Sequence, residues 1–161
     1  MAFYRNEGKT PPKRHTVFNY DNKLCYEELV SREGFSSIYT NLYHVNMPTS
    51  ILKVGDFIEN ILVKAKTKHQ AKHIQTFNID SYNDAITSRV PLFFNDDVVI
   101  SIAQIDRKMD YLYRNGHNDE LLYIQYGEGV LSTNFGNLVY KKGDYIVIPR
   151  GVIWKHSYNK K

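Results

Sequence analysis

Short apolar runs alternate with clusters of glycine, asparagine and charged residues, most regularly beyond Pro91. A first run at 97–105 is rich in β-branched residues, which favour strands. The runs that follow lie at 110–114, 120–126, 129–135, 137–140 and 145–149. Turn-forming stretches such as "RNGHND" and "KKGD" separate them. Short strands joined by such turns predict an all-β fold, an antiparallel sandwich or barrel.

The amino-terminal part of the chain is less regular. Residues 1–20 contain Pro11-Pro12 and have no apolar period, which is typical of an extended arm laid on a neighbouring surface or left in solvent. The stretch "EELVSREGF" at 27–35 favours a short helical turn that ends at Gly34.

The middle of the chain also has a β pattern, but its apolar and polar positions alternate less regularly. Residues 36–46 alternate as a strand, and two more strands are predicted at 60–66 and 72–79, although 50–66 also fits a helix. We therefore expect two parts in the chain. These are an extended arm with a short helical turn over 1–35 and a β-barrel domain with little helix over 36–161.

Composition and charge limit the partners and the location that we expect for this protein. The formal charge is +4, but the lysines are dispersed, and Lys64, Lys66 and Lys68 alternate as they would on one solvated strand face. No helix-turn-helix, zinc-finger or RNA-recognition signature accompanies them, so we expect no nucleic-acid partner. The single cysteine, Cys25, suits a reducing compartment. With no apolar run long enough for a signal peptide or a bilayer span, we expect a cytoplasmic protein without a membrane partner.

Two blocks near the carboxyl end carry a spaced motif. The first runs from Glu120 to a glycine in "ELLYIQYGEG", and the second lies in "GDYIVIPRGVIW". The turn positions of the two blocks are Gly127, Gly143, Pro149 and Gly151. Glycines permit tight turns at strand ends, and a proline ends ladder pairing so that the chain can bend. The pair of blocks resembles the double signature of the cupins, and this resemblance implies a small antiparallel jelly-roll barrel.

The same resemblance implies where a metal would be held. In metal-binding cupins, two histidines precede the glutamate by six and four residues, and a third follows the last glycine by three. Arg114, Gly116 and Trp154 occupy those positions here, and only Glu120 remains. An iron site needs convergent imidazole and oxygen ligands with open positions. We therefore expect no metal ligand, no catalytic residue and no cofactor in this chain.

Two less direct arrangements of the same region stay open. A displaced ligand set could use His117, Glu120 and His156, because His156 would share a strand face with Trp154. A metal-free barrel would instead have a pocket lined by Glu120, Tyr123, Trp154 and His156. Trp154 would then fill the barrel by packing. A buried Glu120 would need a partner, for which Arg114 or a hydroxyl group inside the barrel is available.

Longer stretches carry a more specific resemblance. "FYRNEGKTPPKRHTVF", "CYEELVSREGFSSIYTNLYHVNMPT" and "DELLYIQYGEGVLSTNFGNLVYKKGDYIVIPRG" together resemble the amino-terminal part of homogentisate 1,2-dioxygenase in its shorter bacterial form. The match covers nearly the whole chain and is weakest at 50–90. It implies an Fe(II) enzyme of tyrosine and phenylalanine breakdown that opens the ring of homogentisate to maleylacetoacetate.

In that family two cupin-like halves share one chain, and the iron ligands lie in the carboxy-terminal half. None of the histidines here matches a family ligand position; they are His15, His44, His69, His73, His117 and His156. The resemblance thus implies a scaffold that is inactive alone and that partners a carboxy-terminal cupin half within a homo-oligomer. Such a scaffold is expected to expose an apolar surface for its partner.

Two other functions remain open at this stage. One is a stand-alone, metal-free cupin that binds a small aromatic or sugar-like ligand, with Glu120 as a base if burial raises its pKa. The other is a metal enzyme that uses the displaced set of His117, Glu120 and His156.

Overall fold

The structure is a computed structural model that describes residues 17–31, 33–36, 39–56, 62–64, 66, 68 and 70–158. The described residues are nearly all strand or connecting loop, with a single 3₁₀ turn, η1 (Thr76–Asn78), so the expected all-β fold with little helix is confirmed. No described helix has the length and apolar character needed to cross a membrane. The "PPKRH" part of the predicted arm, with His15, and also His69, lie outside the described residues.

Fourteen strands make up the described fold. In the amino-terminal part they are β1 (Asn19–Tyr20), β2 (Lys23–Leu24), β3 (Tyr26–Ser31) and β4 (Tyr39–His44). The middle part contains β5 (Tyr82–Asn83), β6 (Val90–Phe94), β7 (Val99–Ile102), β8 (Gln104–Ile105) and β9 (Tyr113–Arg114). The carboxy-terminal part contains β10 (Glu120–Tyr123), β11 (Glu128–Thr133), β12 (Gly136–Lys141), β13 (Tyr145–Ile148) and β14 (Ile153–Tyr158).

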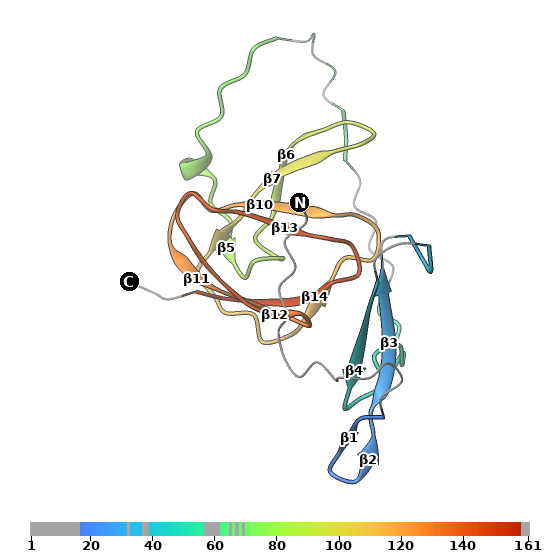
Figure 1. Cartoon of the computed structure of the whole chain (residues 1–161). Coiled ribbons are helices and arrows are strands. Elements are labelled where there is room, and N and C mark those ends of the chain that lie inside the picture. Colours follow the sequence, from blue (N-terminus) through green and yellow to red (C-terminus); the bar gives the residue numbers. More distant parts are fainter. Residues whose placement is uncertain are drawn as a thin grey trace, which may run out of the picture.

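Two facing layers hold the hydrophobic core. One is a four-stranded antiparallel sheet in the order β12-β11-β14-β9, and the other is the pair β10-β13 (Figure 1). The buried apolar residues of both layers and of nearby loops form one cluster: Ala85, Met109, Leu131, Tyr140, Ile146, Ile148, Val152 and Trp154. Inward and outward side chains alternate along a strand, so β13 contributes Ile146 and Ile148 to the cluster, while Leu131, Tyr140 and Trp154 join it from the other sheet.

The pairing among the described residues remains a set of small sheets and does not close into one continuous ladder. One pair also departs from the antiparallel expectation, since Tyr82 and Asn83 of β5 run parallel to Gln104 and Ile105 of β8. The strand predicted at 72–79 is wrong, because its centre forms η1, in which Asn78 N–H donates to the Gln75 carbonyl. The prediction at 60–66 falls partly on residues outside the description, and residues 62–64 form no strand.

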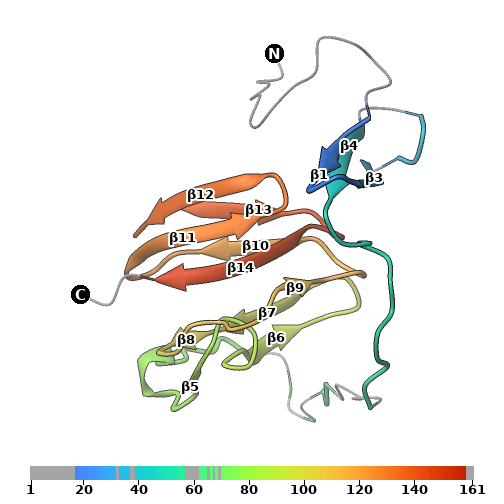
Figure 2. The same ribbon diagram turned by 90° about the horizontal axis from the view of Figure 1, so that it is seen from below.

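The prediction of a helical turn at 27–35 is wrong, because most of this stretch forms strand β3. It pairs with β4 from Tyr26 opposite His44 to Ser31 opposite Tyr39, and this confirms the strand predicted at 36–46. Helical propensity at "EELV" is weak, and tertiary pairing overrides it. The hairpin spans the predicted boundary at residue 35, and it lies to one side of β9–β14 in both views (Figure 2).

A buried carboxylate links this hairpin to the sheet. Glu28 of β3 contacts the ring of His44 on β4 through its Oε2 atom, at 2.7 Å from Nε2. Its other oxygen lies 3.9 Å from Nη1 of Arg114 on β9. Only 14% of the Glu28 side chain is exposed, so both contacts are partly shielded from water.

The turn residues of the two motif blocks lie at strand ends. The glycines at the three turn positions have left-handed backbones: Gly127 (φ 84°), Gly143 (φ 92°) and Gly151 (φ 85°). Pro149 follows the last residue of β13, and its carbonyl accepts a hydrogen bond from the N–H of Val152 at 3.2 Å. These turns connect β10 to β11, β12 to β13 and β13 to β14, and so determine how the two layers face each other.

A different glycine, Gly129, is required by close packing. It lies in the middle of the four-stranded sheet, opposite Tyr140 on β12 and Tyr158 on β14. A Cβ atom added at Gly129 would overlap the Ser157 carbonyl and the Tyr140 hydroxyl. The backbone of β14 and a core tyrosine therefore leave room for no side chain here.

We expect Gly129→Ala to lower the free energy of unfolding by about 1–3 kcal/mol, the usual cost of overpacking a core. Urea unfolding followed by the emission of Trp154 measures this change. Gly116→Ala is the matched control, because a Cβ there meets no atom within 4 Å. Equal stability of the two variants would contradict the packing constraint.

Candidate functional site

Glu120, the one residue of the metal-binding pattern that this chain retains, is buried and paired with an arginine. Its side chain is 9% exposed, and its Oε1 atom lies 2.5 Å from Nη1 of Arg89, whose side chain is 27% exposed. The side-chain amide of Asn115 donates to the same oxygen at 3.4 Å. A buried carboxylate is stable only with such compensation, so Arg89 neutralises Glu120 in the interior.

The loop 84–89 holds Arg89 in place. Asp84 begins this loop, and its Oδ1 atom accepts hydrogen bonds from the N–H groups of Ile86 and Thr87 and from the Tyr111 hydroxyl. Arg89 itself donates from Nε to the Ala85 carbonyl at 3.0 Å. One guanidinium edge is thus fixed by the loop, while the other faces Glu120.

These contacts shift the pKa values of two groups in the loop's network. Burial alone would raise the pKa of Asp84, but the hydrogen bonds from the N–H groups of Thr87 and Ile86 and from Tyr111 outweigh it and lower the pKa. Burial, together with the Asp84 carboxylate, raises the pKa of Tyr111 to about 12. Asp84 is therefore ionised and Tyr111 protonated at neutral pH.

Trp154 fills the interior beside this ion pair. The side chain is fully buried, and its ring meets the Tyr113 ring edge-on, with centroids 5.4 Å apart. The guanidinium carbon of Arg89 lies 5.7 Å from the Tyr113 centroid and 6.0 Å from the Trp154 centroid. Burial and then the charge of Glu120 raise the pKa of Tyr113. The position at which the cupin resemblance expects a histidine thus holds an indole packed against a cation.

Three buried polar atoms of this group have no hydrogen-bond partner: Glu120 Oε2, Arg89 Nη2 and Trp154 Nε1. They are an acceptor and two donors, and buried atoms of these kinds are normally satisfied. The interior therefore offers an anionic oxygen and two N–H groups beside two aromatic rings.

His156 lies one rung from Trp154 on the same inward face of β14, as its spacing predicted. Its Nε2 atom is hydrogen-bonded to the Tyr140 hydroxyl, and the two rings stack with centroids 5.5 Å apart. Burial lowers the pKa of His156 and raises that of Tyr140 to about 12. The tyrosine therefore donates to a neutral imidazole, and the pair forms part of the core.

The structure places the sequence-predicted residues in three locations. Glu120, Trp154 and His156 all face the interior, but Tyr123 lies on the outer face of β10 with 52% of its surface exposed. His117 lies in the exposed turn before β10. Among the described residues, no three of the types His, Cys, Asp and Glu come together as metal ligands, and this applies to His117, Glu120 and His156.

The partner of Glu120 is Arg89, which sequence reasoning missed. Arg114, the suggested partner, instead approaches Glu28. Arg89 lies 31 residues before Glu120 in an irregular loop, so no strand period or motif spacing connects the two residues. The only available sign was that a buried carboxylate requires a cation somewhere in the chain.

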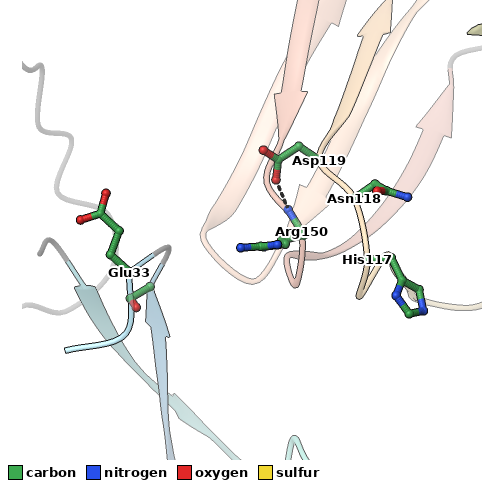
Figure 3. Close-up of a pocket in the computed structure, with 6 residues that line it drawn as sticks. Glu33, His117, Asn118, Asp119 and Arg150 are labelled. Carbon is green, nitrogen blue, oxygen red and sulfur yellow. Dashed lines mark hydrogen bonds between the residues drawn. The ribbon is translucent and has the colours of Figure 1, made fainter. Parts of the chain in front are cut away.

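A surface pocket of about 370 Å³ lies where the hairpin approaches the turns of the sheets (Figure 3). Its lining residues are Ser31, Glu33, His117, Asn118, Asp119 and Arg150. The N–H of Arg150 donates to Asp119 Oδ1 at 2.8 Å, and Glu33 lies across the pocket from this pair. The pocket is polar, and Glu120, Arg89 and Trp154 are not among its lining residues.

Comparison with known proteins relates this chain to part of a longer protein. No protein-family model matches the chain, and no solved structure matches it. The chain is 39% identical over 162 residues to a protein of Saccharolobus solfataricus named "Putative dioxygenase". Its sequence is thus similar to that of a protein named as a dioxygenase. The alignment covers 99% of this chain and 42% of the relative, so the chain spans less than half of the relative's length.

We expect Arg89→Met to destabilise the fold by up to about 3 kcal/mol, because it leaves the buried Glu120 carboxylate without a cation. Equilibrium unfolding at neutral pH measures the loss, and Arg114→Met is the control on a more exposed arginine. The double variant Arg89→Met/Glu120→Gln should recover much of the loss. Additive effects of the two substitutions would mean that the residues do not stabilise each other.

We expect the stabilising effect of Asp84 to disappear in acid. Its folded pKa lies below the ordinary value of 3.8, so its contribution is complete above that pH and is lost as the pH falls through the folded pKa. The stability difference between the wild type and Asp84→Asn should therefore shrink below about pH 4. Urea unfolding from pH 7 to pH 3 measures it, with the exposed Asp97→Asn as control. A difference that stays constant over this range would contradict the prediction.

Proposed function

We propose that this chain is the amino-terminal, non-metal-binding cupin part of a homogentisate 1,2-dioxygenase and serves as a scaffold for the catalytic part of that enzyme. The enzyme uses Fe(II) and dioxygen to open the ring of homogentisate to maleylacetoacetate in the catabolism of tyrosine and phenylalanine. The motif resemblance and the 39% identity to a protein named as a dioxygenase support this proposal.

The burial of Trp154 carries the proposal of a scaffold role. An iron site needs imidazole and carboxylate ligands beside open positions. The residues at the expected ligand positions do not fit iron: the indole of Trp154 carries only an N–H donor, and Arg114 is a cation that faces Glu28. Glu120, the one suitable ligand, is paired with Arg89. We therefore assign no step of ring cleavage to this chain's residues.

The partners in this proposal are the catalytic cupin part of the same enzyme and further copies that form a homo-oligomer. A cytoplasmic location agrees with the free thiol of Cys25 and with this class of metabolic enzyme. The charged surface does not require a nucleic-acid partner, since Lys64, for example, lies 3.8 Å from Asp96.

One observation favours a second candidate, a metal-free cupin that binds a small aromatic or sugar-like ligand. The unpartnered atoms of Glu120, Arg89 and Trp154 could each be satisfied by a polar group of such a ligand. The rings of Tyr113 and Trp154 would flank it.

We expect the purified chain to consume no oxygen with homogentisate and ferrous iron beyond an iron-only blank, because its residues do not fit an iron site. Oxygen uptake measures this, and metal analysis of the same sample should show no stoichiometric iron. Turnover by the chain alone would overturn the scaffold role.

The fluorescence of Trp154, the single tryptophan of the chain, separates the two candidates. Titration with homogentisate should leave the emission unchanged if the chain is a scaffold. Saturable quenching would favour the ligand-binding candidate. Trp154→Phe is the control that assigns the signal to this residue.

A further inference from the structure

The outer face of β10-β13 is an exposed apolar surface, which we call the outer patch. Leu121 lies opposite Val147 in the register of the two strands, and Tyr123 lies opposite Tyr145. The exposed fractions of these side chains are 63% for Leu121, 65% for Val147, 52% for Tyr123 and 68% for Tyr145. Two adjacent cross-strand pairs thus present four apolar or aromatic side chains together.

A sheet with one face in water alternates apolar and polar side chains along each strand, and the outer patch departs from this alternation. Its strands also send apolar residues inward, namely Leu122, Ile146 and Ile148, so both faces of β10-β13 are apolar. Strands with apolar residues on both faces are typical of sheets that are covered on both sides. The outward positions of the four-stranded sheet are more mixed, because the polar Ser132, Lys155 and Ser157 lie there beside the apolar Val130, Val139 and Ile153.

The patch is also preformed. The rings of Tyr123 and Tyr145 contact each other, with centroids 4.7 Å apart and planes inclined at 34°. A paired aromatic surface on regular strands loses little side-chain freedom when it is covered. Tyrosine is also enriched in the residues that dominate binding energy at interfaces.

We propose that the outer patch is the surface on which the catalytic part of the dioxygenase packs; this inference rests on the proposed function. The relative aligns with almost all of this chain but is more than twice as long as the aligned segment. A scaffold of this kind thus occurs in a polypeptide with ample additional chain to cover the patch.

A second copy of this chain is the weaker choice of occupant. A stable independent interface buries about 800 Å² and about 20–30 residues on each side, whereas the outer patch has four principal side chains. A covalently connected domain needs less contact area, because the connection supplies a high effective concentration.

The crystal structure of the full-length Saccharolobus solfataricus relative tests the occupant directly. The side chains equivalent to Leu121, Tyr123, Tyr145 and Val147 should be buried by polypeptide outside the aligned 162 residues. Exposure of this face to solvent, or its burial by the equivalent region of a second copy, would overturn the proposal.

The isolated chain tests the surface itself. We expect the double variant Tyr123→Lys/Tyr145→Lys to reduce binding of the apolar-surface dye ANS by more than about half, since exposed apolar patches bind such probes. Val139→Lys is the matched control, because Val139 is 83% exposed on β12, in the other sheet. Dye binding that falls equally in both variants, or in neither, would overturn the assignment.

Unchanged Trp154 emission shows that each variant retains its core. The failure of this inference is distinguishable from that of the proposed function, since neither readout depends on oxygen uptake. A relative that covers the patch but lacks activity toward homogentisate would refute the proposed substrate alone.

Discussion

The burial of one carboxylate, that of Glu120, is the constraint on which the interior of this molecule depends. An uncompensated charge in a small apolar core would cost more than the packing around it returns. Arg89 supplies the compensation at 2.5 Å, and the loop 84–89 holds Arg89 in position. The hydrogen bonds to Asp84 in turn hold the loop, so a connected set of polar contacts positions the arginine beside the carboxylate.

The contacts around Glu120 also determine which chemistry the buried side chains can perform. The Arg89 cation faces the carboxylate and lies over two aromatic rings, and the indole of Trp154 is fully buried beside it. Of the interior side chains in the described part of the chain that could bind a transition metal, Glu120 is paired with Arg89, and His156 is hydrogen-bonded to Tyr140. This chemistry agrees with a domain whose contribution is shape and stability.

The outer surface of the molecule also agrees with the proposed scaffold role. The sheet that carries Glu120 on its inner face carries Leu121 and Tyr123 on its outer face, so neither face is suited to water. In the relative, more than half of the polypeptide lies outside the aligned segment, and the proposed packing partner of this surface belongs to such additional chain. Interior and exterior together agree with the proposed scaffold role.

The local pattern of residues was enough to predict much of the fold. Period-two alternation and glycine turns predicted β10 to β13, because these strands follow from local spacing and turn chemistry. The same alternation predicted that His156 shares a strand face with Trp154, and the packing of the layers buries that face. Propensity failed at 27–31, where pairing with the next strand, β4, outweighs a weak local preference.

The tertiary structure alone determined the contacts between segments that no regular spacing in the sequence connects. Arg89 reaches Glu120 across 31 residues from an irregular loop, whereas Tyr123, three residues after Glu120, lies on the opposite face of β10 by strand alternation alone. Spacing determines which residues share a strand face, but the packing of the layers determines which face is buried. For this protein the sequence therefore determined strands β10 to β13 and the motif, and the fold determined which charge lies beside Glu120.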